Sequence, residues 1–246
     1  MPTKKLRKNK RTPAVLDFSS HLGKDILAFT TLKLVDFKLK EGDASLNKSQ
    51  KRFLQKKIGI ACDNFPVVRQ VHGRRIIVVK RKSCLANFLG KADGFITVKE
   101  NTPLTVRTAD CLSIFIYDPR HKAIGLVHAG WKGSKKEIAT GAVRQMKKIF
   151  KTNPIDLKVA FGPAIRSCCY EVGSEFKKYF PKEISRKNDR FYLDLPLVNS
   201  RQLAAMGVRV KNIRDCKICT CCDRRFFSYR RQGEKAGRMI SLMMLR

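Results

Sequence analysis

The 246-residue sequence lacks several features that mark common protein classes. No stretch approaches the roughly 20 consecutive apolar residues that a membrane-spanning helix needs, so we expect no membrane association. The basic N-terminus, MPTKKLRKNKR, is not followed by the apolar core of a secretory signal, which predicts a cytoplasmic protein. The chain also has no internal repeat and no low-complexity linker, which favours a single compact domain.

Acidic residues are scarce, since 20 Asp and Glu stand against 53 Lys and Arg and give a net charge of +33. Such a charge attracts polyanions at low ionic strength. It predicts nonspecific association with them, but it does not predict which reaction the protein catalyses. The basic residues are spread along the whole chain, and no recognised nucleic-acid module accompanies them. We interpret the charge as a solvated surface with nonspecific attraction for polyanions and keep nucleic-acid binding as an alternative function.

The first residues differ in composition from the rest of the chain. Residues 1–12 hold six basic side chains and no large apolar cluster, so we predict a flexible basic arm. The remaining residues, 13–246, are predicted to form one catalytic domain. A monomer and a homodimer are both compatible with this composition.

Nine cysteines are present, and their odd number leaves at least one thiol unpaired in any disulfide scheme. In a chain of this length without a secretory signal we expect reduced thiols, which are free to bind metals. The segment CKICTCC offers a C-x-x-C spacing twice, through Cys216 and Cys219 and through Cys219 and Cys222, with Cys221 between the last two. No cysteine or histidine follows Cys222, so a second metal, a redox-sensitive loop and simple packing all remain open.

Short β-branched runs alternate with amphipathic segments and predict an α+β protein with mixed sheets flanked by helices. Strands are predicted over residues 26–34, 66–70, 75–79, 94–98, 104–108, 113–117, 123–128, 157–161 and 208–213. Helices are predicted over residues 50–57, 137–150, 174–179 and 194–206. Ser134 is the expected N-cap of the helix over 137–150, and Gly207 is expected to end the last helix.

Histidine is rare, which restricts the choice of metal ligand or general base to His21, His72, His121 and His128. His72 in RQVHGRR and His128 in IGLVHAGWKG each stand at the end of a strand-like run, beside small residues that allow a close approach. Cys111 lies between two apolar strands in VRTADCLSIF. Two imidazoles and one thiolate are good zinc ligands, and three protein ligands leave a fourth position open for catalysis.

Spacing alone does not establish this metal site. The three residues are separated by 39 and 17 positions, which match no compact zinc-binding pattern, and two strand-end histidines with a core cysteine would look the same. A His₂Cys set also binds copper when a weak axial ligand is near. A multicopper oxidase, however, would need further histidines, and only His21 and His121 remain.

Several longer strings resemble, in the same order, motifs of the laccase-domain family, also called the YfiH-like or purine nucleoside phosphorylase family. They are QVHG at 70–73, ADG at 92–94, TADC at 108–111, HAGWKG at 128–133, GPAI and CYEVG between 162 and 173, and FFSYRR followed by GR up to Arg238. The resemblance implies an α/β/β/α sandwich of the CNF/YfiH-like cysteine–histidine type. It also implies that His72, Cys111 and His128 bind the metal and carry catalysis.

Proteins of that family are described as zinc enzymes that phosphorolyse adenosine, inosine and S-methyl-5′-thioadenosine and deaminate adenosine. For this chain the resemblance therefore implies purine nucleosides and phosphate as substrates, with a copper-dependent polyphenol oxidase as the alternative. Phosphorolysis needs anion binding, and basic side chains in the motifs could supply it. The candidate substrate-binding residues are Gln70, Lys132, Arg230, Arg231 and Arg238, where each arginine could equally pair with a structural carboxylate.

Two acidic residues and two departures from the family pattern complete the analysis. Asp93 or Asp110 could move a proton, although capping a turn is the favoured interpretation for both. Leu32 stands where the family usually has an arginine, and the glycine pair that follows it is missing. Lys132 replaces an arginine and keeps the charge without the planar fork. The resemblance therefore implies a substrate site that differs from the family pattern at these positions.

Overall fold

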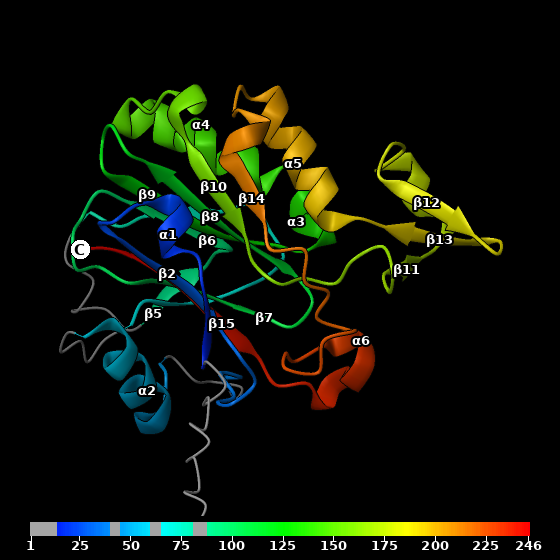
Figure 1. Ribbon diagram of the computed structural model, residues 1–246, viewed down its shortest axis with the longest axis horizontal. Coiled ribbons are helices and arrows are strands. Elements are labelled where there is room, and N and C mark those ends of the chain that lie inside the picture. The colour runs from blue at the N-terminus through cyan, green and yellow to red at the C-terminus, as the bar shows by residue number, and fades with distance from the viewer. Residues whose placement is uncertain (1–13, 40–44, 60–64, 81–87) are drawn as a thin grey trace, which may run out of the picture.

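The computed structural model describes residues 14–39, 45–59, 65–80 and 88–246 (Figure 1). The predicted basic arm over residues 1–12 lies outside the described residues. Two larger sheets lie face to face, and helices cover their outer faces. The polypeptide therefore forms four layers, with the sheets in the middle.

The larger sheet has six strands in the order β14-β10-β8-β9-β6-β4. Their bounds are Ile213–Asp215, Lys158–Phe161, Leu112–Asp118, Ala123–Ala129, Gly94–Thr97 and Ile76–Val78. The central strands β8 and β9 form an antiparallel hairpin in which every strand residue is buried. Because both faces are covered, these strands consist of almost continuous apolar runs.

Helices α4 (Ile138–Phe150) and α5 (Leu195–Ala205) lie on the outer face of this sheet. Ile138, Ala142 and Met146 are fully buried against it, as their helical spacing predicts. The predicted N-cap was wrong. Ser134 lies inside the short helix α3 (Trp131–Lys135), where its hydroxyl accepts a 2.9 Å hydrogen bond from Asn199 Nδ2, and α4 begins only after Glu137.

The second sheet has four strands in the order β1-β2-β15-β7. Their bounds are Val15–Asp17, Ile26–Thr31, Met239–Leu245 and Leu104–Thr108. Its inner face contributes Ala28, Val106 and Met243 to the core shared with the six-stranded sheet. Its outer face packs on helix α2 (Lys48–Ile58) through residues such as Leu54. The α/β/β/α sandwich implied by the family resemblance is therefore confirmed.

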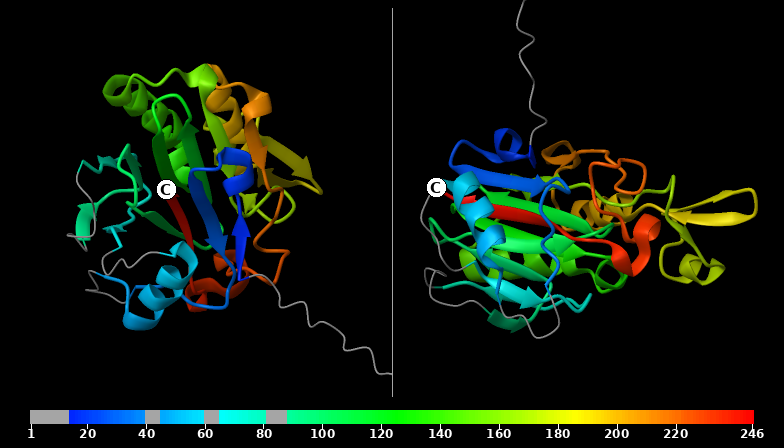
Figure 2. Two further views of the ribbon diagram at one scale, coloured as in Figure 1. Left: turned by 60° about the vertical axis from the view of Figure 1, so that its left-hand side comes forward. Right: turned by 90° about the horizontal axis from the view of Figure 1, so that it is seen from below.

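Smaller elements complete the architecture. They are helices α1 (Ser19–Leu22) and α6 (Tyr229–Gln232), the paired strands β3 (Val67–Arg69) and β5 (Phe88–Lys91), and the sheet of β11 (Glu171–Val172), β13 (Arg190–Leu193) and β12 (Ile184–Lys187). The β12–β13 hairpin projects from the body of the molecule (Figure 2). Among the described residues, no helix is long and apolar enough to cross a membrane.

Two predicted elements differ from the structure. The helix expected over 174–179 is a 3-10 helix over Ser174–Lys178. The strand expected over 208–213 is wrong for most of its length, because a 3-10 helix covers Val210–Asn212 and β14 begins at Ile213. Val208 is buried whereas Val210 is 65% exposed, and two residues that would share one face of a strand cannot differ in this way.

Candidate functional site

His72, Cys111 and His128 come together at one end of the β8–β9 hairpin. Cys111 immediately precedes β8, His128 lies near the end of β9, and the register pairs Ser113 with His128. His72 approaches from the turn after β3, and one potential ligand atom from each residue lies within 4.8 Å of the other two. The imidazole rings of His72 and His128 have their centroids 4.9 Å apart. The antiparallel pairing of β8 and β9 thus brings Cys111 and His128 together although 17 positions separate them in the sequence.

Asp93 holds two of these residues in place. Its buried carboxylate accepts hydrogen bonds from the backbone amides of Val71, His72 and Gly73, at 3.2, 2.9 and 2.7 Å. It also lies 3.0 Å from Nδ1 of His128. This contact leaves Nε2 of His128 free for a ligand, which is the usual arrangement of a metal-binding histidine and its carboxylate. Asp93 therefore caps the turn, as the favoured interpretation of the sequence held, and it also orients His128, which the sequence did not predict.

Asp110 also has a structural role, which its hydrogen bonds define. Its carboxylate accepts 2.6 Å hydrogen bonds from the Thr220 hydroxyl and from the Arg230 amide, and its backbone carbonyl accepts one from the Ile165 amide. The residue has a φ of 82°, a left-handed conformation that turns the chain just before Cys111. Asp110 thereby fixes the segment that presents the thiol.

Gly130 allows the backbone to pass directly beside the two more accessible members of the group. A Cβ at this position would lie 2.8 Å from Sγ of Cys111 and 3.1 Å from Cδ2 of His72. The small residue following the strand was noted in the sequence, and the structure supplies its physical reason. Any larger side chain at position 130 would displace a potential ligand.

The protonation of the group suits metal binding. Burial opposes ionisation of Cys111, but the charge of His128 and hydrogen bonds from both imidazoles outweigh it and lower the pKa of the thiol to about 6. Burial also opposes a charge on His128, yet the Cys111 thiolate and the Asp93 carboxylate raise the pKa of its imidazole. Without a cation the two residues therefore form a thiolate–imidazolium pair, and a bound metal ion would replace the imidazolium proton.

The group opens onto a cavity of about 1050 Å³. Three aromatic side chains, Trp131, Tyr170 and Tyr229, lie on its walls together with apolar Val68 and Ile165. Burial and the nearby Cys111 thiolate raise the pKa of Tyr170, so its hydroxyl keeps its proton at neutral pH. A cavity of this size, with aromatic walls and a few convergent polar groups, is typical of a small-molecule site.

Arg107 is a cavity residue that the sequence analysis missed. Its Nη2 donates to the Val68 carbonyl at 2.8 Å, whereas its buried Nη1 has no hydrogen-bond partner among the described residues. Burial and the charge of Arg238, which lines the same cavity, lower the pKa of Arg107 to about 10. None of the ion pairs in the described part of the chain includes either guanidinium. Two neighbouring cations without a carboxylate favour an anionic ligand.

Four of the five predicted substrate-binding residues line the cavity, but they differ in how free they are. Gln70 uses both ends of its amide to bond the backbone of Arg107 at 2.8 Å, so it positions that arginine. Arg230 donates to the carbonyls of Cys169 and Glu171. Lys132 also lines the cavity, and its Nζ lies 5.5 Å from the centre of the Trp131 ring.

The structure does not bring Arg231 to the cavity. Its guanidinium donates to the carbonyls of Thr220, Cys221 and Phe226 at 2.6 to 2.8 Å, which makes it a clamp for the loop before α6. Arg238 reaches the cavity while it donates to the carbonyls of Ala236 and Gly237. The motif FFSYRR therefore supplies one cavity arginine and one structural arginine.

The other two histidines, His21 and His121, and the residue Leu32 do not line the cavity. His21 Nε2 is 3.1 Å from the Val159 carbonyl, and His121 pairs with Asp118. Leu32 is buried beside Phe226 and Met239 and does not line the cavity. Leu32 directly follows β2, and the arginines Arg107 and Arg238 line the cavity.

The residues present fit a bound metal ion. Two imidazoles and an ionised thiol converge from three segments, a carboxylate orients one imidazole, and the cavity reaches all three side chains. Three protein ligands facing a cavity leave room for a substrate atom. The group is therefore a candidate metal site on the wall of a small-molecule cavity.

Comparisons with known proteins agree with this architecture. A purine nucleoside phosphorylase of Clostridium acetobutylicum is 37% identical over 160 residues, which cover 63% of this chain and 67% of that protein. A protein named adenosine deaminase RL5, from an unknown prokaryotic organism, is 30% identical over 232 residues and 87% of each chain. The crystal structure of YlmD from Geobacillus stearothermophilus superposes with a TM-score of 0.87 at 26% identity, over 97% of this chain and 98% of that one.

A family model described as multi-copper polyphenol oxidoreductase laccase matches residues 30–246. This match includes every motif on which the resemblance was based and both larger sheets except β1 and the first part of β2. The predicted family is confirmed. The chain belongs to the multi-copper polyphenol oxidoreductase laccase family, the laccase-domain family whose curated relatives are named as enzymes.

Proposed function

We propose that the protein is a zinc-dependent purine nucleoside phosphorylase. It would convert adenosine, inosine and S-methyl-5′-thioadenosine to the free base and ribose 1-phosphate or its methylthio derivative. The observation that carries the proposal is the sharing of one cavity by the His72–Cys111–His128 group and by two guanidinium groups that pair with no carboxylate among the described residues. The naming of relatives as purine nucleoside phosphorylases supports it.

Arg107 and Arg238 are the proposed phosphate-binding residues. The charge of phosphate would relieve the repulsion between the two guanidinium groups. Lys132 adds a third positive charge on the cavity wall. Arginine suits this task because its fork matches two phosphate oxygens at once.

The aromatic wall is the proposed purine site. Trp131, Tyr170 and Tyr229 offer flat apolar surfaces against which a purine can stack. The Tyr170 hydroxyl keeps its proton at neutral pH and can therefore donate a hydrogen bond to a ring nitrogen. This arrangement recognises the base by shape and by one polar contact.

The proposed reaction breaks the bond between C1′ of the ribose and N9 of the purine. A phosphate oxygen forms the new bond to C1′, and the base leaves with the electron pair of the broken bond and takes up a proton. Arg107 and Arg238 would hold phosphate, and the aromatic wall would hold the base, so that the two reactants meet in one orientation. A zinc ion bound by His72, Cys111 and His128 would supply Lewis acidity on the wall of the same cavity.

Adenosine deamination is a second proposed activity of the same cavity. The relative that covers 87% of this chain is named an adenosine deaminase. In that reaction water replaces the amino group on the purine ring and ammonia leaves. The two activities share a purine site and differ in whether phosphate or water is the nucleophile.

Zinc is the proposed metal in preference to copper. A multicopper site needs several further histidines, and the two that remain in this chain bond to Val159 and Asp118 away from the cavity. A single copper in the His₂Cys group is the alternative on which a polyphenol oxidase activity would depend. Metal analysis of the purified protein, with phenol-dependent oxygen uptake, separates the two metals.

The test of the proposed function is base release from a nucleoside panel with and without phosphate. Zinc-loaded protein should release hypoxanthine from inosine only when phosphate is present, and Cys111→Ala should abolish this turnover. Arg107→Lys should raise the KM for phosphate about 10- to 100-fold, because it loses one or more charged hydrogen bonds. Arg144→Ala, which removes an exposed partner of Glu137 on α4, is the matched control and should leave the KM unchanged.

Two outcomes would contradict the proposal. If zinc-loaded protein releases no base from adenosine, inosine or S-methyl-5′-thioadenosine, the phosphorylase assignment is wrong. If turnover occurs but Arg107→Lys leaves the phosphate KM at the wild-type value, the reaction stands and the phosphate site must be placed elsewhere.

A further inference from the structure

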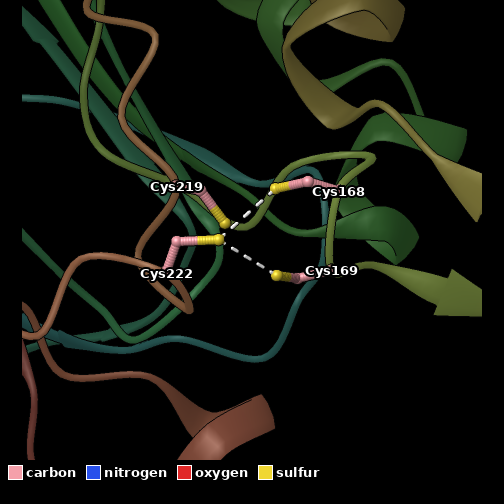
Figure 3. Close-up of side chains that lie close together, drawn as sticks. All are labelled: Cys168, Cys169, Cys219 and Cys222. Atoms are coloured by element: carbon pink, nitrogen blue, oxygen red, sulfur yellow. Dashed lines mark hydrogen bonds between the residues drawn. The ribbon is translucent and has the colours of Figure 1, made fainter.

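A second group of cysteines lies outside the site described above. Cys168 and Cys169 follow β10, and Cys219 and Cys222 follow β14, so two loops about 50 positions apart in sequence supply two thiols each. One sulfur atom from each residue lies within 4.8 Å of the other three. Figure 3 shows that the four side chains point toward one another. We propose that these four cysteines form a structural zinc site.

The distances between the sulfurs fit one tetrahedral ion. Zinc–sulfur bonds of about 2.3 Å in a tetrahedron place the sulfurs about 3.8 Å apart. The Cys222 sulfur is 3.6 Å from that of Cys168 and 3.3 Å from that of Cys169, and the remaining separations extend to no more than 4.8 Å. Small side-chain rotations suffice to make the six separations equal. An iron–sulfur cluster would place several atoms between its cysteine sulfurs, for which this group has no room.

The chemistry of the ligands selects zinc and a closed site. Four thiolates satisfy all positions of a tetrahedral zinc ion, which is typical of structural rather than catalytic zinc. All four residues are free cysteines in the structure, so no disulfide competes for the sulfurs. Zinc bound by four thiolates carries two net negative charges. Arg230 and Arg231 lie beside it, since they donate to the carbonyls of Cys169 and Cys221.

The surrounding contacts show what such an ion would hold together. The two cysteine-bearing loops already meet through a bridge between Ala164 and Cys219 and a hydrogen bond from the Thr220 amide to the Ala164 carbonyl. Tyr170, on the cavity wall, directly follows Cys169, and Thr220 donates to the Asp110 carboxylate that fixes the segment before Cys111. Zinc would therefore join the loop that carries Tyr170 to the loop that braces Asp110.

The sequence could not reveal this site because its ligands pair across the fold. Of the two C-x-x-C spacings, the structure uses Cys219 and Cys222, while Cys216 packs against a hydrophobic cluster of the sheet core and is not part of the four-cysteine group. A zinc ribbon would place its second ligand pair after Cys222, where the sequence has no cysteine or histidine, whereas the partners Cys168 and Cys169 lie upstream and adjacent to each other. Adjacent cysteines have no recognised ligand spacing of their own.

The test is the zinc content per chain of the full-length protein purified from zinc-supplemented medium. The wild type should contain two zinc ions, and the double variant Cys219→Ser/Cys222→Ser should contain one. Cys111→Ala should also contain one, because it empties the other site, and Cys216→Ser, the matched control on the same segment, should retain two. A wild type with one ion that Cys111→Ala removes would overturn the proposal and leave the candidate metal site intact.

X-ray absorption on the Cys111→Ala protein keeps the proposal testable if the double variant does not fold. The remaining zinc should show a shell of four sulfurs at about 2.3 Å without nitrogen. A shell that contains nitrogen, or iron in place of zinc, would overturn the assignment. A thiol count on chelated, denatured wild-type protein should find all nine cysteines reduced. A count lower by two in the wild type, but not in Cys219→Ser/Cys222→Ser, would indicate a disulfide in place of the metal.

Discussion

Gly130 offers a test of the candidate metal site that changes none of its ligands. The Cβ of Gly130→Ala would lie 2.8 Å from the Cys111 sulfur, so the thiol or the backbone must move. Gly130 has a φ of −78°, which alanine adopts freely, so the effect is steric and not a backbone strain. We expect zinc affinity at this site to fall about tenfold or more, measured by competition with a chromogenic chelator in the Cys219→Ser/Cys222→Ser background.

The control for this substitution is Gly141→Ala in helix α4. A Cβ at position 141 would meet only Cδ1 of Ile76, at an ordinary 3.9 Å, and alanine favours the helix by up to about 1 kcal/mol. This variant should bind zinc as the wild type does. Wild-type affinity in Gly130→Ala would show that Cys111 and His72 are not both ligands.

Site residues that stand in a recognisable sequence context could be predicted from the sequence. Site residues that are distinguished only by their neighbours in the folded protein could not. His72, Cys111 and His128 were selected because histidine is rare and each stands at a strand end, and the structure brings them together. Arg107 was missed although it lies in the quoted string VRTADC, because only burial beside Arg238 distinguishes it from 52 other basic residues. In the sequence, Cys168 also cannot be distinguished from a cysteine that packs in the core. Only the pairing of β10 with β14 shows that it lies beside Cys219 and Cys222.

At the scale of elements, the turn between β8 and β9 depends on one buried carboxylate. Asp118 ends β8 with a fully buried side chain, accepts from the amides of Arg120 and His121, and lies 2.8 Å from the His121 ring. Burial opposes its charge, but the nearby Thr152 hydroxyl, the His121 ring and the two amides together outweigh burial and lower its pKa. Since the hairpin carries His128 and precedes Gly130, the turn fixes the register of the strand that reaches the site.

Asp118→Asn should lower the free energy of unfolding by about 1–3 kcal/mol at pH 7, because the variant loses a buried charged acceptor that holds the turn. The folded-state pKa lies below the unfolded value of about 3.9, so the contribution of the carboxylate is complete above that value and declines as the pH falls through the lowered folded pKa. Urea unfolding of both proteins at pH 7 and pH 3 should therefore show a smaller difference at pH 3.

The exposed carboxylate of Asp189, in the β12–β13 turn, is the control for Asp118. Its side chain is 86% exposed and pairs with Arg186 on the same hairpin, so Asp189→Asn should not change unfolding measurably at either pH. If Asp118→Asn costs no stability at pH 7, the turn is held by its backbone alone and the pKa of Asp118 has no bearing on the fold.

Strands with a clear pattern were predicted well, and strands defined by their partners were not. The ranges expected at 94–98, 104–108, 113–117 and 123–128 correspond closely to β6, β7, β8 and β9. β15 received no prediction, although it lies at the centre of the four-stranded sheet, because its run MISLMML is buried on both faces and shows no alternation. The strands β12 and β13 were missed for the opposite reason, since their exposed charged residues resemble a loop.

At the scale of the whole molecule, the net charge of +33 predicts strong but unselective attraction for polyanions at low salt. The basic residues are spread along the chain, and the described part of it pairs few of them with carboxylates. Such binding depends on the release of counterions, and its affinity falls about 10³- to 10⁵-fold between 50 and 200 mM salt when six to ten phosphates are contacted.

Fluorescence anisotropy with two duplexes of unrelated sequence tests this expectation. Both should bind at 50 mM salt with the same affinity and the same salt slope, and neither should bind measurably near 200 mM. Cys111→Ala should behave as the wild type does, because a diffuse surface charge does not involve the cavity. A preference for one duplex that persists at 200 mM salt would instead identify nucleic acid as a specific partner, since counterion release carries no sequence information and selective binding requires contacts to the bases.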